Sequence, residues 1–157
     1  MGETMNVRPA EEKDIEGVVE LAFQFENYLD ELESTPESER VPRHRIKQVF
    51  LEGFSDPKHV ILVVEEDDKI IGYSDFWIYP EFIHGGQTAY LNNIFISEKF
   101  RRKGIGSKLL GDTIKKAKGM DAVALHISIL PKNIIAQNFY KKNDITWEIK
   151  MLELKLK

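Results

Sequence analysis

A basic turn interrupted by glycines is the first stretch of this sequence whose residue types could do chemistry. It reads Arg101-Arg102-Lys103-Gly104-Ile105-Gly106-Ser107 and lies between an apolar run and a helical pattern. Glycine lets the backbone approach a ligand closely, and the first N–H groups of a helix have no partner within the helix. These donors, the helix dipole and the adjacent cations suit a phosphate group. We therefore predict a phosphate site here; the alternative is a basic turn that only caps a surface helix.

Two common phosphate-binding loops do not fit this turn. A mononucleotide loop of the Walker type needs four residues between its first glycine and a Gly-Lys-Ser/Thr, and the sequence contains nothing of that form. The dinucleotide fingerprint needs a third glycine where the sequence has Leu109. The pattern that remains is Arg-x-x-Gly-x-Gly after an apolar strand.

A second motif follows one predicted strand later. Residues 133–140 read Asn-Ile-Ile-Ala-Gln-Asn-Phe-Tyr. Arg-x-x-Gly-x-Gly followed by Asn-x-x-Ala-x-x-Phe-Tyr resembles the two hallmarks of the GNAT superfamily, the acetyl-CoA-dependent N-acetyltransferases. Taken alone, the second segment also fits an amphipathic helix whose core face carries Ile134, Ile135, Phe139 and Tyr140.

The resemblance implies acetyl-CoA as the cofactor and assigns roles to individual residues. The main chain of residues 101–107 would bind the pyrophosphate. Pantetheine would lie along the backbone near Ile94, Phe95 and Ile96, where the N–H of Ile94 would hold the acetyl carbonyl. Asn133 and Ala136 would contact the cofactor from the second motif. The hydroxyl of Tyr140 would protonate the departing thiolate as a general acid.

Within the superfamily the chain is most similar to the diamine and polyamine acetyltransferases related to spermidine/spermine N-acetyltransferase. In that branch a glutamate on the strand before the phosphate turn acts as base, whereas this sequence has Asn92 there. An amide cannot accept a proton from the amine. The candidates to replace it are Asp75, Glu81, His84 and His126, or a water held by Asn92 and its neighbour. The alternative for His126 is a core histidine bonded to the backbone.

Charge is divided unevenly along the chain. Residues 1–98 carry 8 Lys and Arg against 21 Asp and Glu, and residues 99–157 carry 14 against 5. An acidic half and a basic half suggest two ligands of opposite charge. We therefore expect an amine acceptor at the acidic end. The residues expected to bind it are Glu26, Tyr28, Asp30, Glu31 and Asn92.

Three functions remain open. The leading one is direct transfer of an acetyl group to a primary amine of a small diamine or polyamine, because the chain has no cysteine to carry an acyl-enzyme. The second is acetylation of a protein N-terminus or a lysine side chain. The third is an acyl-CoA-binding module without turnover, which the loss of a base at Asn92 favours and the presence of Tyr140 opposes.

The hydrophobic periodicity predicts a mixed α/β fold in one domain, residues 1–157, with helices on both faces of a central sheet. The expected helices span residues 11–29, 43–54, 104–118 and 133–142. The expected strands span residues 5–9, 59–65, 70–79, 88–96, 122–129 and 146–156, the last on clean alternation of apolar and polar residues.

Composition excludes several classes of protein. Without cysteine there are no disulfides or thiolate metal sites, and we expect no metal. No apolar run approaches a membrane span, and the N-terminus has no signal-like segment, so we expect a cytoplasmic protein. The aromatic residues are not interleaved with the cations, which disfavours nucleic acid as a partner. The expected partner is a small-molecule amine, without nucleic acid or membrane, and a homodimer is allowed.

Overall fold

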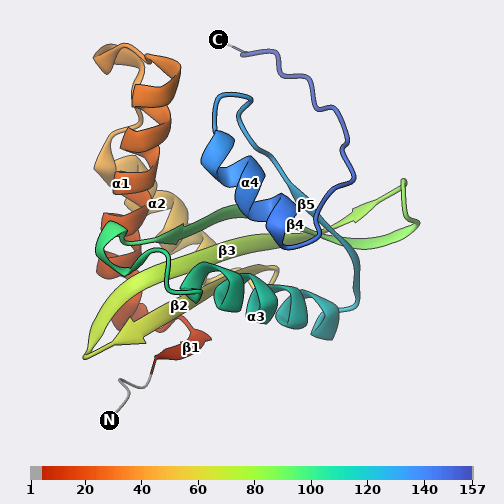
Figure 1. Ribbon diagram of the computed structural model, residues 1–157, viewed down its shortest axis with the longest axis horizontal. Helices are drawn as coiled ribbons and strands as arrows, with labels where there is room; N and C mark the ends of the chain where they lie inside the picture. The colour runs from red at the N-terminus through yellow and green to blue at the C-terminus, as the bar shows by residue number, and fades with distance from the viewer. Residues whose placement is uncertain (1–4, 157) are drawn as a thin grey trace. The chain divides into compact units, whose positions relative to one another are not determined.

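A computed structural model describes residues 5–156 of the chain, which form two compact units divided between Ile127 and Ser128. The first unit contains one five-stranded sheet in the order β1-β2-β3-β4-β5, which can be followed in Figure 1. Neighbouring strands are antiparallel except β4 and β5, which are parallel. Its strands are β1 (Asn6–Pro9), β2 (His59–Glu66), β3 (Lys69–Glu81), β4 (Gly86–Ile96) and β5 (Ala122–Ile127). Its α-helices are α1 (Ile15–Glu33), α2 (Arg43–Phe54) and α3 (Ile105–Gly119), and the second unit contains α4 (Ile134–Lys142).

Helices cover both faces of this sheet, as the sequence predicts. Along β2 the buried side chains alternate between the two faces, because successive side chains of a strand point in opposite directions. Ile61 and Val63 pack with α1 and α2, whereas Leu62 and Val64 pack with α3. A strand buried on both sides needs a continuous apolar run, and residues 60–64 supply one. The fold class is therefore the predicted mixed α/β sheet. That the whole chain is one domain stays a prediction.

Strand β4 has two irregularities in its middle. Asp75 of β3 pairs with Asn93 and Phe76 pairs with Leu91, so Asn92 is the extra residue of a β-bulge. The parallel pairing with β5 ends at Leu91 and Ile127, although β4 continues to Ile96. Within the described residues, 92–96 therefore have no strand partner on the β5 side. Bulges bend a strand and re-aim its side chains, and this one lies where the two strands part.

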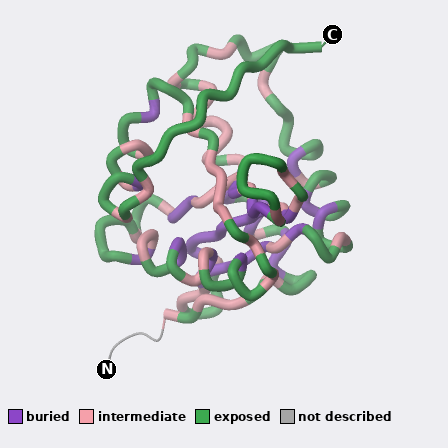
Figure 2. Tube along the Cα trace, turned by 90° about the vertical axis from the view of Figure 1, so that its right-hand side faces the viewer, coloured by how far each residue is buried: buried purple, intermediate pink, exposed green. Residues whose placement is uncertain are grey.

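The predicted strand at residues 146–156 is wrong. This segment has no regular secondary structure, and its alternating apolar side chains are exposed, with Leu152 81% and Leu156 88% exposed. Figure 2 shows the chain near the C-terminus in green, the colour of exposed residues. Alternation describes a strand that has one buried face, but a strand also needs a hydrogen-bonded neighbour. The five-stranded order of the sheet does not include this segment.

Other boundaries differ by a few residues. The first helix begins at Ile15, after a short 3-10 turn, and continues to Glu33, where Ser34 ends it with a left-handed φ of 56°. Strand β5 ends at Ile127 instead of continuing to residue 129. In the described part of the chain, no helix combines the length and the apolar character needed to cross a membrane.

Candidate active site

The basic turn has the backbone geometry of a phosphate site. Gly104 is the N-cap of α3 with φ of +78°, and no heavy atom lies within 4 Å of the position that a Cβ would take there. The N–H of Lys108 makes the first helical bond, to the carbonyl of Gly104 at 3.1 Å. The N–H groups of Ile105, Gly106 and Ser107 precede that bond, so they remain available to a ligand. The residues present therefore fit a phosphate-bearing cofactor.

Two basic side chains of the turn contact neighbouring residues of the protein. Arg101 donates from Nε to the carbonyl oxygen of Ile96 at 2.8 Å, and its guanidinium lies over the Phe95 ring. Lys103 Nζ lies 5.5 Å from the centroid of the Phe100 ring. Arg101 thus holds the turn against the end of β4. That Arg101, Arg102 and Lys103 bind phosphate stays a prediction.

A cavity of about 720 Å³ lies beside α1 and α2 and reaches β3 and β4. We call it the α1–α2 cavity. Its charged lining residues are Glu26, Arg40, Arg45, Glu39, Glu52 and Asp75, so carboxylates outnumber guanidinium groups by four to two. Asn92 and Asn93, at the bulge of β4, also line it. The bulge therefore faces a space of the size that small-molecule sites have.

Asp75 lies buried on the wall of this cavity and is held by three hydrogen bonds. Its Oδ2 accepts from Nε2 of His59 and from Nδ2 of Asn92, each at 2.8 Å. Its Oδ1 accepts from Nδ2 of Asn93, also at 2.8 Å. Asn92, which the resemblance placed where a base is expected, instead donates to a carboxylate one strand away. A carboxylate of β3 therefore lies beside position 92; that Asp75 replaces the missing base stays a prediction.

His59 is the site residue that sequence reasoning missed. Its ring is parallel to that of Trp77, with centroids 4.3 Å apart, and its Nδ1 is buried without a hydrogen-bond partner among the described residues. A Cβ on Gly53 would lie 2.0 Å from that Nδ1, so α2 needs glycine there to make room for the imidazole. The only sign of this residue in the sequence was a histidine at the start of an apolar strand. That position does not indicate which residue the histidine would bond to.

The acidic residues of α1 divide into two groups. Glu26 is half-buried and lines the α1–α2 cavity, and burial, with the charge of Asp30, raises the pKa of its carboxyl. Tyr28, Asp30 and Glu31 are not among the lining residues of this cavity, and Glu31 is exposed. Of the predicted acceptor residues, the structure therefore brings together Glu26 and Asn92. Roles for the other three stay predictions.

His126 lies elsewhere in the first unit. Its Nδ1 is 2.8 Å from the hydroxyl of Tyr79, and it is not a lining residue of the α1–α2 cavity. The sequence alternative for His126 was a core histidine bonded to the backbone, whereas the structure shows a hydrogen bond to the side chain of Tyr79. A catalytic role for His126 stays a prediction.

The second unit carries the Asn-x-x-Ala-x-x-Phe-Tyr motif. Oδ1 of Asn133 accepts from the N–H of Ala136 at 3.2 Å, so this side chain caps α4. Tyr140 packs edge-on against Phe139, and burial raises the pKa of its phenol. Asp144 takes a left-handed φ of 62° after the helix, a conformation that Asp adopts more readily than most residues other than glycine. A phenol with a raised pKa stays protonated at neutral pH, which a proton donor requires.

Comparison with known proteins identifies the family. Residues 25–144 match the model of the acetyltransferase (GNAT) family, which is more than half of the chain. The chain belongs to the acetyltransferase (GNAT) family. It is therefore an acyltransferase that takes its acetyl group from acetyl-CoA, as the resemblance implied.

Relatives with assigned activities are distant. The chain is 30% identical over 93 residues to a Bacillus subtilis (strain 168) protein assigned provisionally as a ribosomal protein bS18-alanine N-acetyltransferase. That match covers 59% of this chain and 58% of the relative. It is 25% identical to the uncharacterized N-acetyltransferase YhfO of the same organism, over 88% of each chain.

Solved structures confirm the fold. The aminoglycoside N-acetyltransferase AAC(6')-Iy, in complex with CoA, matches with a TM-score of 0.80 at 16% identity, over 99% of this chain and 97% of that one. A ribosomal-protein-alanine N-acetyltransferase from Brucella melitensis biovar Abortus 2308 matches with a TM-score of 0.74 at 15% identity, over 98% and 100%.

Proposed function

We propose that this acetyltransferase acts on a primary amine of a small cation with two or more amino groups, a diamine or polyamine. The observation that carries the proposal is the α1–α2 cavity, whose four carboxylates face a space large enough for such a cation. A second amino group would pair with one carboxylate while the first reacts. Because carboxylates outnumber guanidinium groups in this cavity, its net negative charge would also raise the local concentration of a cationic substrate.

Two carboxylates of the cavity would have different roles, one in binding the amine and one in accepting its proton. Asp75 is held in one orientation by three hydrogen bonds, which suits binding of an ammonium or of the attacking amine. Glu26 has a raised pKa, and a base whose pKa approaches the working pH accepts a proton more effectively. We assign Glu26 the proton acceptor's role, directly or through one water. These groups would replace the missing base at Asn92.

Acetyl-CoA, the acetyl donor, would be bound mainly by main-chain groups. Acetyl-CoA supplies the activated acetyl group when bound. The N–H groups of residues 105–107 would hold its pyrophosphate, and the unpaired edge of β4 at residues 92–96 would receive its pantetheine arm. The phenol of Tyr140 would give its proton to the leaving sulfur. In a direct transfer, in which the amine attacks the thioester and CoA leaves, orientation of both substrates would supply much of the rate.

A panel of amines tests this proposal, with release of free CoA from acetyl-CoA as the readout. We expect kcat/KM for spermidine or a diamine to exceed that for a monoamine of equal length and to fall as salt screens the charges. Equal activity on both amines, without salt dependence, would refute the small-cation proposal. Activity only on a peptide with an N-terminal alanine would favour the second candidate, protein N-terminal acetylation, which the sequence similarity to the Bacillus subtilis relative supports.

A further inference from the structure

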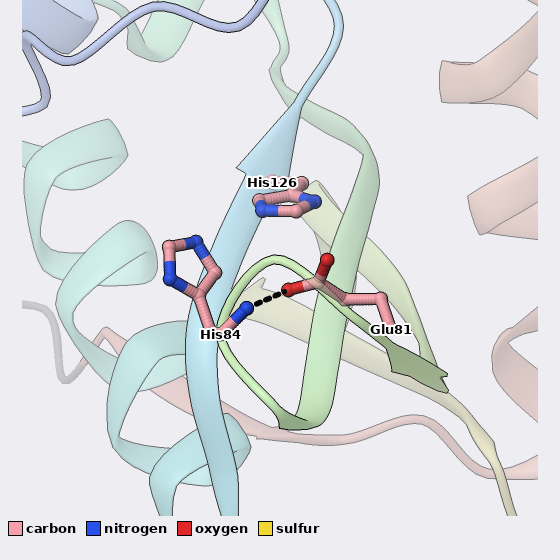
Figure 3. A group of neighbouring side chains, drawn as sticks. All are labelled: Glu81, His84 and His126. Atoms are coloured by element: carbon pink, nitrogen blue, oxygen red, sulfur yellow. Dashed lines mark hydrogen bonds between the residues drawn. The ribbon is translucent and has the colours of Figure 1, made fainter.

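A group of side chains of the types that bind metals lies around the turn between β3 and β4. The proposed acetyl transfer does not use them. Glu81 ends β3, His84 lies in the turn, and His126 lies on β5, so the fold brings the three together from different parts of the sequence. One ligand atom from each lies within 4.8 Å of the other two. Figure 3 shows the carboxylate of Glu81 directed toward the ring of His126, with the ring of His84 beside them.

His126 is arranged as a metal-binding histidine would be. Its Nδ1 lies 2.8 Å from the hydroxyl of Tyr79, while its Nε2 is buried and has no hydrogen-bond partner among the described residues. When Nδ1 carries the proton and donates a hydrogen bond to the hydroxyl of Tyr79, Nε2 is unprotonated and has a free lone pair. Histidines that bind metals usually donate their second ring nitrogen to such a partner, which fixes the tautomer. A buried nitrogen without a partner is otherwise costly.

Glu81 is held in place as a charged ligand. Its Oε2 accepts from the N–H of Ile83 at 2.8 Å, and its Oε1 accepts from the N–H of His84 at 3.1 Å and from the hydroxyl of Thr88 at 3.2 Å. Each carboxylate oxygen accepts two bonds, so Oε2 keeps a lone pair for a cation.

We propose that Glu81, His84 and His126 bind a divalent cation of the zinc class. Two imidazoles and one carboxylate suit Zn²⁺, Co²⁺ or Ni²⁺, whereas Mg²⁺ and Ca²⁺ prefer oxygen ligands. Ligand atoms around one tetrahedral zinc lie about 3.3 Å apart, so the group must close by roughly 1–2 Å. The exposed His84 side chain, on a turn, can make that movement. Water would complete the fourth position.

The bound cation would join the β3–β4 turn to β5. His126 pairs with Tyr90 of β4, one residue before the last pair between these strands, Leu91 and Ile127. The site therefore lies close to the place where β4 and β5 part. Because the cation binds the folded protein, it stabilises that state by mass action.

Titration of the full chain with Zn²⁺, after removal of metal with a chelator, tests the proposal by calorimetry and thermal unfolding. We expect one cation per chain and a rise in Tm. His84→Ala should weaken the affinity at least about tenfold, and Tyr79→Phe, which removes the partner of His126, by about 10–100-fold. The matched control is His44→Ala, which removes an exposed histidine of α2 and should change nothing.

Co²⁺ gives a spectroscopic readout that does not depend on acetyl transfer. We expect the visible absorption of a four-coordinate cobalt site in the wild type and in His44→Ala, and its loss in His84→Ala. His84 is exposed, so this variant should fold, and its unliganded Tm checks that it does. Equal affinity in the wild type, His84→Ala and His44→Ala would overturn the proposal, as would the absence of any binding by the wild type.

Discussion

The imidazole of His59 and the carboxylate of Asp75 form a buried hydrogen bond of 2.8 Å between β2 and β3, with side chains only 1% and 4% exposed. Among the described residues no Lys or Arg forms an ion pair with this carboxylate, and its other partners are the amides of Asn92 and Asn93. The rings of Trp77 and Phe50 stack against the imidazole of His59. A carboxylate held in this way keeps its orientation while one side remains open to the α1–α2 cavity.

Changing Asp75 to Asn should therefore reduce acetylation of the preferred amine. The amide is of similar size but has no charge to attract the amine, so we expect kcat/KM to fall by about 10–10²-fold, while the rise in Tm caused by acetyl-CoA is retained. The matched control is Asp68→Asn in the β2–β3 turn, where the left-handed φ of 60° suits asparagine. Unchanged kcat/KM in Asp75→Asn would remove Asp75 from the proposed site.

Glu26→Gln should make the protein more stable and less active. The pKa of the Glu26 carboxyl is raised in the folded state, so folding favours its protonated form. The stability gained from this preference is complete below the ordinary carboxyl pKa of about 4.3 and is lost as the pH rises through the raised pKa. At pH 7 the ionised carboxylate is a cost that glutamine removes, a gain of up to about 1 kcal/mol. Thermal unfolding at pH 4 and pH 7 measures the difference, which should be larger at pH 7. An equal Tm change at both pH values would contradict the burial argument.

Gly104→Val should abolish stabilisation by acetyl-CoA. A side chain at φ of +78° is strained by roughly 1–2 kcal/mol, and it would also stand in the open space where the cofactor's phosphates must approach. The control is Gly111→Ala within α3, which also meets open space but lacks a positive φ, and which should stabilise the helix by up to about 1 kcal/mol. Thermal unfolding with and without acetyl-CoA separates the two effects. A normal Tm shift in Gly104→Val would remove the turn from the cofactor site.

Tyr140→Phe should lower turnover by about 10²–10⁴-fold with little change in acetyl-CoA affinity, because the ring is kept and only the proton donor is lost. Burial raises the pKa of this phenol, so the wild type should keep its proton donor beyond the ordinary tyrosine pKa of about 10. Loss of the phenol's proton should accordingly not lower the rate at about pH 10. Turnover within a factor of about three of the wild type would exclude Tyr140 from the mechanism.

The sequence by itself determined the parts of this protein that depend on local pattern. The apolar run at residues 60–64 predicted a strand, and the helical period predicted the bounds of α2 to the residue. The two motifs indicated the family, because the glycines of the phosphate turn and the residues of Asn-x-x-Ala-x-x-Phe-Tyr occur at fixed spacings within short stretches of the chain.

Tertiary structure alone decided the contacts between residues distant in sequence. That Asn92 donates to Asp75, and that His59 does so too, depends on a strand register and a bulge, which no spacing along the chain encodes. The failed strand at residues 146–156 has the same cause, since alternation specifies a face but cannot supply a neighbouring strand. The grouping of Glu81, His84 and His126 likewise exists only because parallel pairing sets β5 beside β4. Local periodicity is a property of one segment, whereas a site is made by side chains that only the folded sheet brings together.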